Sequence, residues 1–183
     1  AVGLGWTVVQ MPTWSSSQTL FERAVEVAPS NAGAWDKLAS VAADEGNLDL
    51  ALHYTEQGLA HASGNWRLLH RQGLLLSSWG RLDEAIEIMS KAASTPEAHR
   101  AYANLALLHL ERGDEEEAVR AAEEAVRLQP RATHNQRVRG IVAYQLGDTR
   151  RACVAFDRAY ALDPYDDANI GNLELCDRDP EER

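Results

Sequence analysis

Four glycines recur along the chain at nearly constant spacing, and this constrains the fold more than any other feature. They stand 34, 33 and 34 residues apart. An alanine follows each glycine by five residues, and a further small residue follows each alanine by seven. The glycines are Gly46, Gly80, Gly113 and Gly147, the alanines Ala51, Ala85, Ala118 and Ala152, and the later small residues Gly58, Ala92, Ala125 and Ala159. A fixed period of this length is typical of architectures in which each repeat stacks on its neighbours.

The sequence around each glycine predicts two helices joined by a tight turn. The four segments read EGNLDLALHY, WGRLDEAIEI, RGDEEEAVRA and LGDTRRACVA. A glycine can adopt the left-handed conformation that ends a helix, and the polar residues after it suit the start of the next one. Pro29, Pro130 and Pro164 stop second helices, because proline lacks the N–H group and clashes with the preceding turn. The chain is therefore predicted to be all-α, with about nine or ten helices in antiparallel pairs.

These repeats resemble the tetratricopeptide repeat (TPR), whose pattern runs W-x₂-L-G-x₂-Y, then A-x₃-F, then P. Trp35 and Leu38 match its opening, and Ala152 and Phe156 match A-x₃-F. Ser63 departs from the closing proline, which Pro96 supplies one residue early in the next repeat. The resemblance covers residues 19 to about 176. It implies a right-handed α-solenoid whose concave groove, lined by first helices, binds a peptide or a partner protein.

The period divides the chain into an arm, an array and a cap. We expect residues 1–17 to form an amino-terminal arm or the stub of a membrane helix, and residues 18–31 to form an orphan second helix. Residues 32–166 are predicted to hold four repeats, at 32–65, 66–98, 99–132 and 133–166, and residues 167–183 to form a capping helix and tail.

The amino end adds a second resemblance. Trp14, Leu20, Phe21, Ala24 and Pro29 are similar to a junction in polytopic membrane proteins with carboxy-terminal TPRs. Many of those are glycosyltransferases of the lipid-linked type, with the TPRs on the extracytoplasmic side. The alternative is that Trp6 and Trp14 pack an amino-terminal arm against the first helices.

Composition and motifs argue against other classes of function. A net charge of −10 disfavours nucleic acid as the main ligand, which needs a clustered basic surface. Nucleophile elbows, P-loops, dinucleotide-binding turns and H-E-x-x-H helices are absent from the sequence. The six histidines show no ligand spacing, and Cys153, beside Ala152 in a second helix, favours a buried structural thiol over a nucleophile. We therefore expect no enzymatic activity, no cofactor and no metal.

The TPR register places a group of side chains on the first helices of repeats two to four. The predicted groove consists of Arg67, His70, Arg71, Arg100, Asn104, Leu107, His134, Arg137, Ile141 and Tyr144. Arginine binds carboxylates in a bidentate way, so an acidic or carboxy-terminal peptide is the expected ligand. The alternative is that these arginines are solvated or paired with acidic residues of neighbouring helices.

Three functions follow, in decreasing order of support. The first is a protein-interaction scaffold, which would be cytoplasmic if the chain is complete. The second is an accessory TPR domain of a membrane-bound glycosyltransferase, on the extracytoplasmic face and attached to the membrane only through an upstream segment. The third is an enzyme in its own right, which the missing motifs disfavour.

Overall fold

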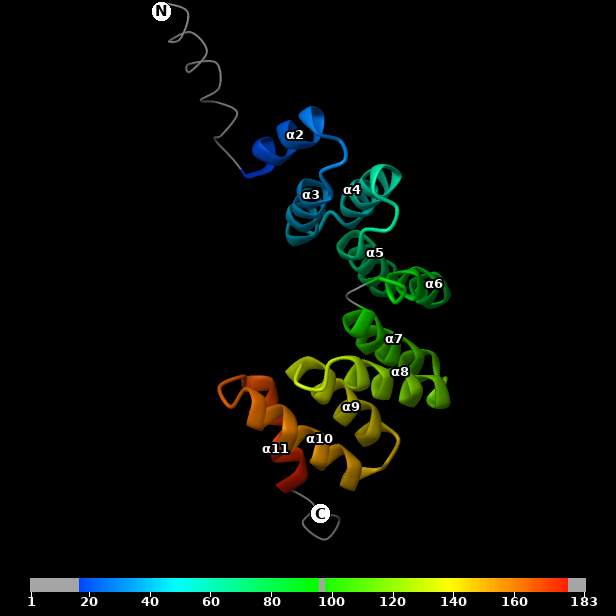
Figure 1. Ribbon diagram of the computed structural model, residues 1–183, viewed down its shortest axis with the longest axis vertical. Helices are drawn as coiled ribbons and strands as arrows, with labels where there is room; N and C mark the ends of the chain where they lie inside the picture. Colours follow the sequence, from blue (N-terminus) through cyan, green and yellow to red (C-terminus); the bar gives the residue numbers. More distant parts are fainter. Residues whose placement is uncertain (1–16, 96–97, 178–183) are drawn as a thin grey trace, which may run out of the picture. The chain divides into compact units, whose positions relative to one another are not determined.

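The computed structural model describes residues 17–95 and 98–177, and within these ranges the chain is an array of ten α-helices without a strand (Figure 1). The predicted all-α class is therefore confirmed. The predicted arm or membrane-helix stub lies outside the described residues except for Ser17, as does the end of the tail. The helices belong to two compact units, Ala1–Arg81 and Leu82–Arg183.

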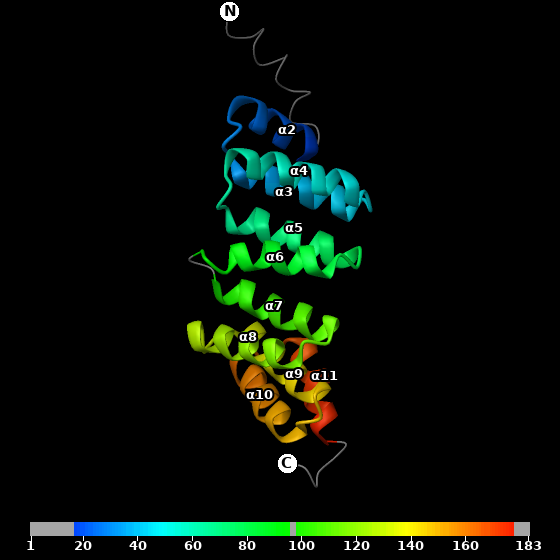
Figure 2. The same cartoon turned by 90° about the vertical axis from the view of Figure 1, so that its right-hand side faces the viewer.

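The described part of the first unit contains four helices. They are α2 (Ser17–Val27), α3 (Ala32–Asp44), α4 (Leu48–His61) and α5 (Trp66–Ser78). Helices α3 and α4 lie side by side in both views, α2 packs on α3, and α5 packs on both α3 and α4 (Figures 1 and 2). One apolar cluster joins Val25, Ala34 and Leu38 beneath Trp35. Burial of this apolar face, more than helix propensity, holds such short helices together.

The described part of the second unit contains six helices. They are α6 (Leu82–Ala92), α7 (Ala98–Arg112), α8 (Glu115–Leu128), α9 (Thr133–Gln145), α10 (Thr149–Leu162) and α11 (Asp167–Asp177). Helices α7 and α8 form one tightly packed pair, and α9 and α10 form another. The pairs stack through contacts of α9 with both α7 and α8, α6 packs on α7, and α11 packs on α10.

The four periodic glycines adopt the backbone conformation predicted for them. Gly46, Gly80, Gly113 and Gly147 have φ angles of 78°, 70°, 90° and 81°. Residues with a side chain rarely adopt such angles, so glycine ends the preceding helix at little cost. After Gly46, the Asn47 side chain accepts a hydrogen bond from the Leu50 N–H at 3.2 Å and caps α4.

The periodic alanines are fully buried, as their spacing predicts. Ala51, Ala85, Ala118 and Ala152 each expose 0% of their surface. At the later small position of the first repeat, a Cβ added to Gly58 would lie 2.7 Å from the Trp35 Cβ atom. Small residues at these positions therefore allow neighbouring helices to approach closely.

The division into four repeats remains a prediction. The boundary between the two compact units falls after Arg81, inside the predicted repeat 66–98.

The two cysteines correct the prediction of a buried structural thiol. Cys153 on α10 and Cys176 on α11 form a disulfide bond with a Cα–Cα distance of 5.7 Å. The bond lies in a buried cluster with Ala152 and Phe156, against which Ile141 also packs. Spacing along the sequence did not reveal this pair, because the two cysteines meet only where the capping helix docks on α10.

Candidate binding site

The predicted groove residues of the first unit lie on α5. Arg71 donates a hydrogen bond from Nε to Asp36 Oδ1 of α3 at 2.6 Å, with both side chains mostly buried. The Arg67 guanidinium lies 5.5 Å from the centre of the Trp66 ring, within range of a cation–π contact. The His70 ring lies 6.3 Å from that of Trp66, edge to face. The charge of Arg71 is thus already balanced within the unit.

The predicted residues of the second unit lie on α7 and α9, which pack against each other. Arg100 is exposed on α7, and the Asn104 side chain donates a hydrogen bond to the Arg100 carbonyl oxygen at 3.0 Å. Leu107, further along α7, is partly buried. Arginine and apolar residues therefore do occur together on this first helix.

On α9, Arg137 forms an ion pair. Its Nη1 donates to Asp166 Oδ2 at 2.7 Å, and this hydrogen bond lowers the pKa of the Asp166 carboxyl below its ordinary value. His134 and Tyr144 are exposed near the two ends of the helix. Ile141 packs partly into the core beside the disulfide. The alternative reading of the arginines, pairing with acids of neighbouring helices, thus applies to Arg71 and Arg137.

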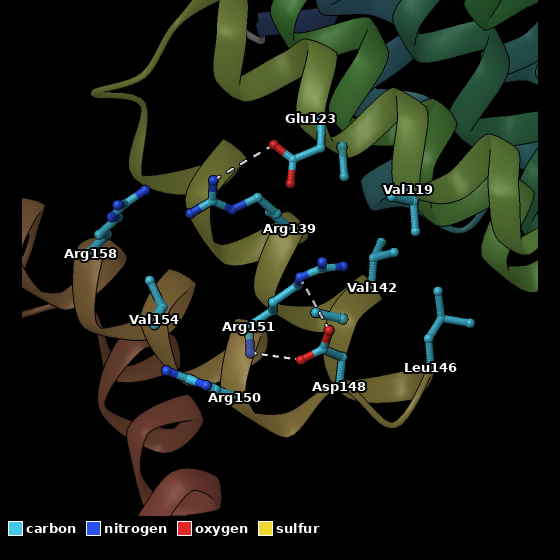
Figure 3. A pocket seen from close by; sticks show the side chains of 12 residues that line it. Val119, Glu123, Arg139, Val142, Leu146, Asp148, Arg150, Arg151, Val154 and Arg158 are labelled. Carbon is cyan, nitrogen blue, oxygen red and sulfur yellow. Dashed lines mark hydrogen bonds and ion pairs between the residues drawn. The ribbon is translucent and has the colours of Figure 1, made fainter. Parts of the chain in front are cut away.

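A second group of charged side chains, which sequence reasoning missed, surrounds a cavity of about 730 Å³ between α8, α9 and α10 (Figure 3). Its charged residues are Arg139, Arg150, Arg151, Arg158, Glu123 and Asp148. We call it the arginine pocket. Three of its arginines come from α10, where residue 158 lies about two helical turns beyond the adjacent residues 150 and 151. These arginines lie on a second helix, whereas the predicted groove consists of residues on first helices.

Residues 17–95 and 98–177 contain no cluster of three or more His, Cys, Asp or Glu side chains placed to hold a metal ion. None of the helices in the described ranges is long and apolar enough to cross a membrane.

Comparison with known proteins points to one family. A family model described as tetratricopeptide repeat matches residues 13–65, 70–133 and 103–167. Comparison with curated proteins by sequence found no significant match.

Solved structures with the same fold share little sequence with the chain. One is pilF of Pseudomonas aeruginosa, with 23% identity, a TM-score of 0.75, and coverage of 96% of this chain and 82% of that one. A thermophilic TPR protein of Thermus thermophilus has 17% identity and a TM-score of 0.75, covering 94% of this chain and 95% of that one. YrrB, described as a TPR protein with an unusual peptide-binding site, has 19% identity and a TM-score of 0.62, covering 89% and 84%. At these identities the likeness shows the fold.

Proposed function

Because the chain belongs to the tetratricopeptide-repeat family, we propose that it is a protein-interaction scaffold whose first helices bind an acidic or carboxy-terminal peptide segment. The family and its fold support the scaffold role. TPR proteins are generally non-catalytic, and the sequence holds no motif of an enzyme active site. We therefore propose that the chain has no catalytic activity of its own.

The observation that carries the proposal is an exposed arginine, Arg100, on a helix that packs against the helix of Arg137. A carboxylate can bind a guanidinium through two parallel hydrogen bonds. Arg137 already binds Asp166, so a ligand would have to share or displace that carboxylate. Arg100 contributes a second guanidinium from the neighbouring helix α7, and the exposed Tyr144 ring offers apolar contact further along α9.

The test compares Arg100→Glu with Arg131→Glu, which makes the same change of charge at an exposed arginine in the turn between α8 and α9. Short random peptides displayed with a free carboxy-terminus are selected on the wild-type chain, and the selected peptides are measured by fluorescence anisotropy. We expect acidic or carboxylate-terminated peptides to lose about tenfold or more in affinity with Arg100→Glu and to keep it with Arg131→Glu. Binding should weaken as salt is added.

Equal affinities for both variants would refute first-helix binding. Circular dichroism checks that each variant is folded. We expect both to remain folded, because exposed charge changes usually alter stability by no more than about 0.5 kcal/mol. Arg137→Glu is a poorer test, since it would place two carboxylates together at Asp166.

A second candidate function is an accessory TPR domain of a membrane-bound glycosyltransferase on the extracytoplasmic side. The disulfide between Cys153 and Cys176 favours the extracytoplasmic part of this proposal, because disulfides persist in oxidising compartments. Thiol-alkylation mass spectrometry on protein trapped in its native cells would test it. Two alkylated cysteines would contradict an oxidising location, and a bonded pair together with upstream membrane-spanning helices in the full gene would support this candidate.

A further inference from the structure

The arginine pocket carries more positive charge than the chain neutralises there. Four arginines and two carboxylates line it, in a chain whose net charge is −10. Both carboxylate oxygens of Asp148 already have partners. Its Oδ1 accepts a hydrogen bond from the backbone N–H of Arg151 at 2.9 Å and caps α10, and its Oδ2 lies 3.3 Å from Arg151 Nε. Among the described residues, Arg150 and Arg158 form no ion pair. The pocket is thus locally cationic.

Arg139 is the least exposed of the four. Only 17% of its side chain is exposed, yet the nearest carboxylate oxygen, on Glu123, lies 3.8 Å from its Nη1. That distance is too long for a hydrogen bond. Figure 3 shows the guanidinium groups of Arg139 and Arg158 pointing toward one another. A mostly buried cation beside like charge gains stabilisation when an anion enters and hydrogen-bonds to it.

The rest of the lining is apolar. Val119, Val142, Leu146 and Val154 line the pocket, and Val119 and Val154 expose 39% and 47% of their surface. A volume of about 730 Å³ lies within the range of known ligand-binding pockets, and such a pocket can hold a ligand about as large as several amino-acid side chains. A small inorganic anion would pair with the arginines but leave these valines in contact with water. The chemistry that satisfies both parts is a carboxylate next to an apolar side chain.

We propose that the arginine pocket is a second docking site, on the face of α8 and α10, for an acidic segment of a partner protein that also carries an apolar side chain. Carboxylates of the segment bind Arg150 and Arg158 at the exposed rim and reach Arg139 deeper in the pocket. The apolar side chain contacts Val119 and Val154. The site shares no residue with the predicted first-helix groove, so the two proposals can be tested independently of each other.

The experiment selects short random peptides on the full chain and measures each selected peptide against three variants of equal charge change. Arg158→Glu alters the pocket, Arg100→Glu alters the first-helix face, and Arg131→Glu is the control in the turn between α8 and α9. We expect a class of peptides rich in Asp or Glu with Leu, Ile or Val. This class should bind about tenfold more weakly to Arg158→Glu and within about twofold of wild type to the other two variants. Arg150→Glu should reproduce the loss.

Chemical-shift mapping adds a readout of position, since peptides of this class should perturb amides of α8 and α10 around Val119 and Val154. The proposal is overturned if no selected peptide is sensitive to Arg158→Glu. It is also overturned if inorganic phosphate alone binds the pocket while peptides do not, because a small anion would then be the occupant. Concentration-dependent self-association that Arg158→Glu abolishes would likewise replace a foreign partner with a second copy of the chain.

Discussion

At the scale of single residues, the fold depends on positions where no larger side chain fits. Gly140 on α9 faces the ring of Phe156 on α10, and a Cβ added there would lie 2.3 Å from Cε1 of that ring. Phe156 is 1% exposed and cannot move away freely. Gly171 on α11, by contrast, has nothing within 4 Å of an added Cβ. The same residue type thus serves close packing in one helix and leaves open space in the other.

This contrast yields a matched pair of substitutions. Gly140→Ala should destabilise the chain by about 1–2 kcal/mol, because overpacking costs about 1–3 kcal/mol and the gain in helix propensity offsets less than that. Gly171→Ala should instead stabilise α11 slightly, by up to about 1 kcal/mol, through helix propensity alone. Urea unfolding of both variants measures the difference. If Gly140→Ala were as stable as wild type, α9 and α10 would not approach each other as closely as described.

At the scale of helices, an asparagine early in a first helix supports the end of the second helix before it. Asn135 of α9 donates from Nδ2 to the carbonyl oxygens of Ala125 and Gln129, at 2.7 and 3.2 Å. Asn169 of α11 does the same for Ala159 and Asp163, at 3.3 and 2.8 Å. These bonds satisfy carbonyl groups that a helix end leaves without partners. Besides these hydrogen bonds, the disulfide and the apolar packing of Leu173 against the surrounding cluster join α11 to α10.

Removing that disulfide should release the capping helix first. Closing a loop with a sequence separation of 23 residues lowers the entropy of the unfolded chain. In the chain-entropy model this stabilises the folded state by about 3 kcal/mol. Reduction, or the paired substitution Cys153→Ser with Cys176→Ser, should therefore speed amide hydrogen exchange in α11 while exchange in α7 and α8 changes less. The serine variant is its own control, since a reductant should leave it unaffected. Unchanged exchange in α11 after reduction would show that the apolar contacts alone hold the helix.

At the scale of the whole molecule, the sequence predicted what is periodic and missed what depends on pairs of distant residues. The left-handed glycines and buried alanines follow from spacing alone, because each recurs once per repeat. The ion pairs of Arg71 with Asp36 and of Arg137 with Asp166 join residues 35 and 29 positions apart. No local pattern marks such partners, so the sequence prediction overstated the uncompensated positive charge of the groove. The arginine pocket was overlooked for a related reason, since three helices build it together.

Acid should weaken the second unit through its paired carboxylates. Hydrogen bonds from His109 and Arg112 lower the pKa of Asp114, and bonds from Arg137 and Arg127 lower the pKa values of Asp166 and Glu124. A carboxyl group whose folded pKa lies below its unfolded value of about 4 stabilises the fold at pH above that value. The stabilisation is lost as pH falls through the folded pKa.

Urea unfolding from pH 7 to pH 3 should therefore show stability decreasing with acid, and Asp114→Asn should flatten that decrease by removing one of the titrating groups. Asp157→Asn, at an exposed position on α10, provides the control and should retain the wild-type slope. If Asp114→Asn kept the full slope as well, the bonds from His109 and Arg112 would contribute nothing to the acid sensitivity of the fold.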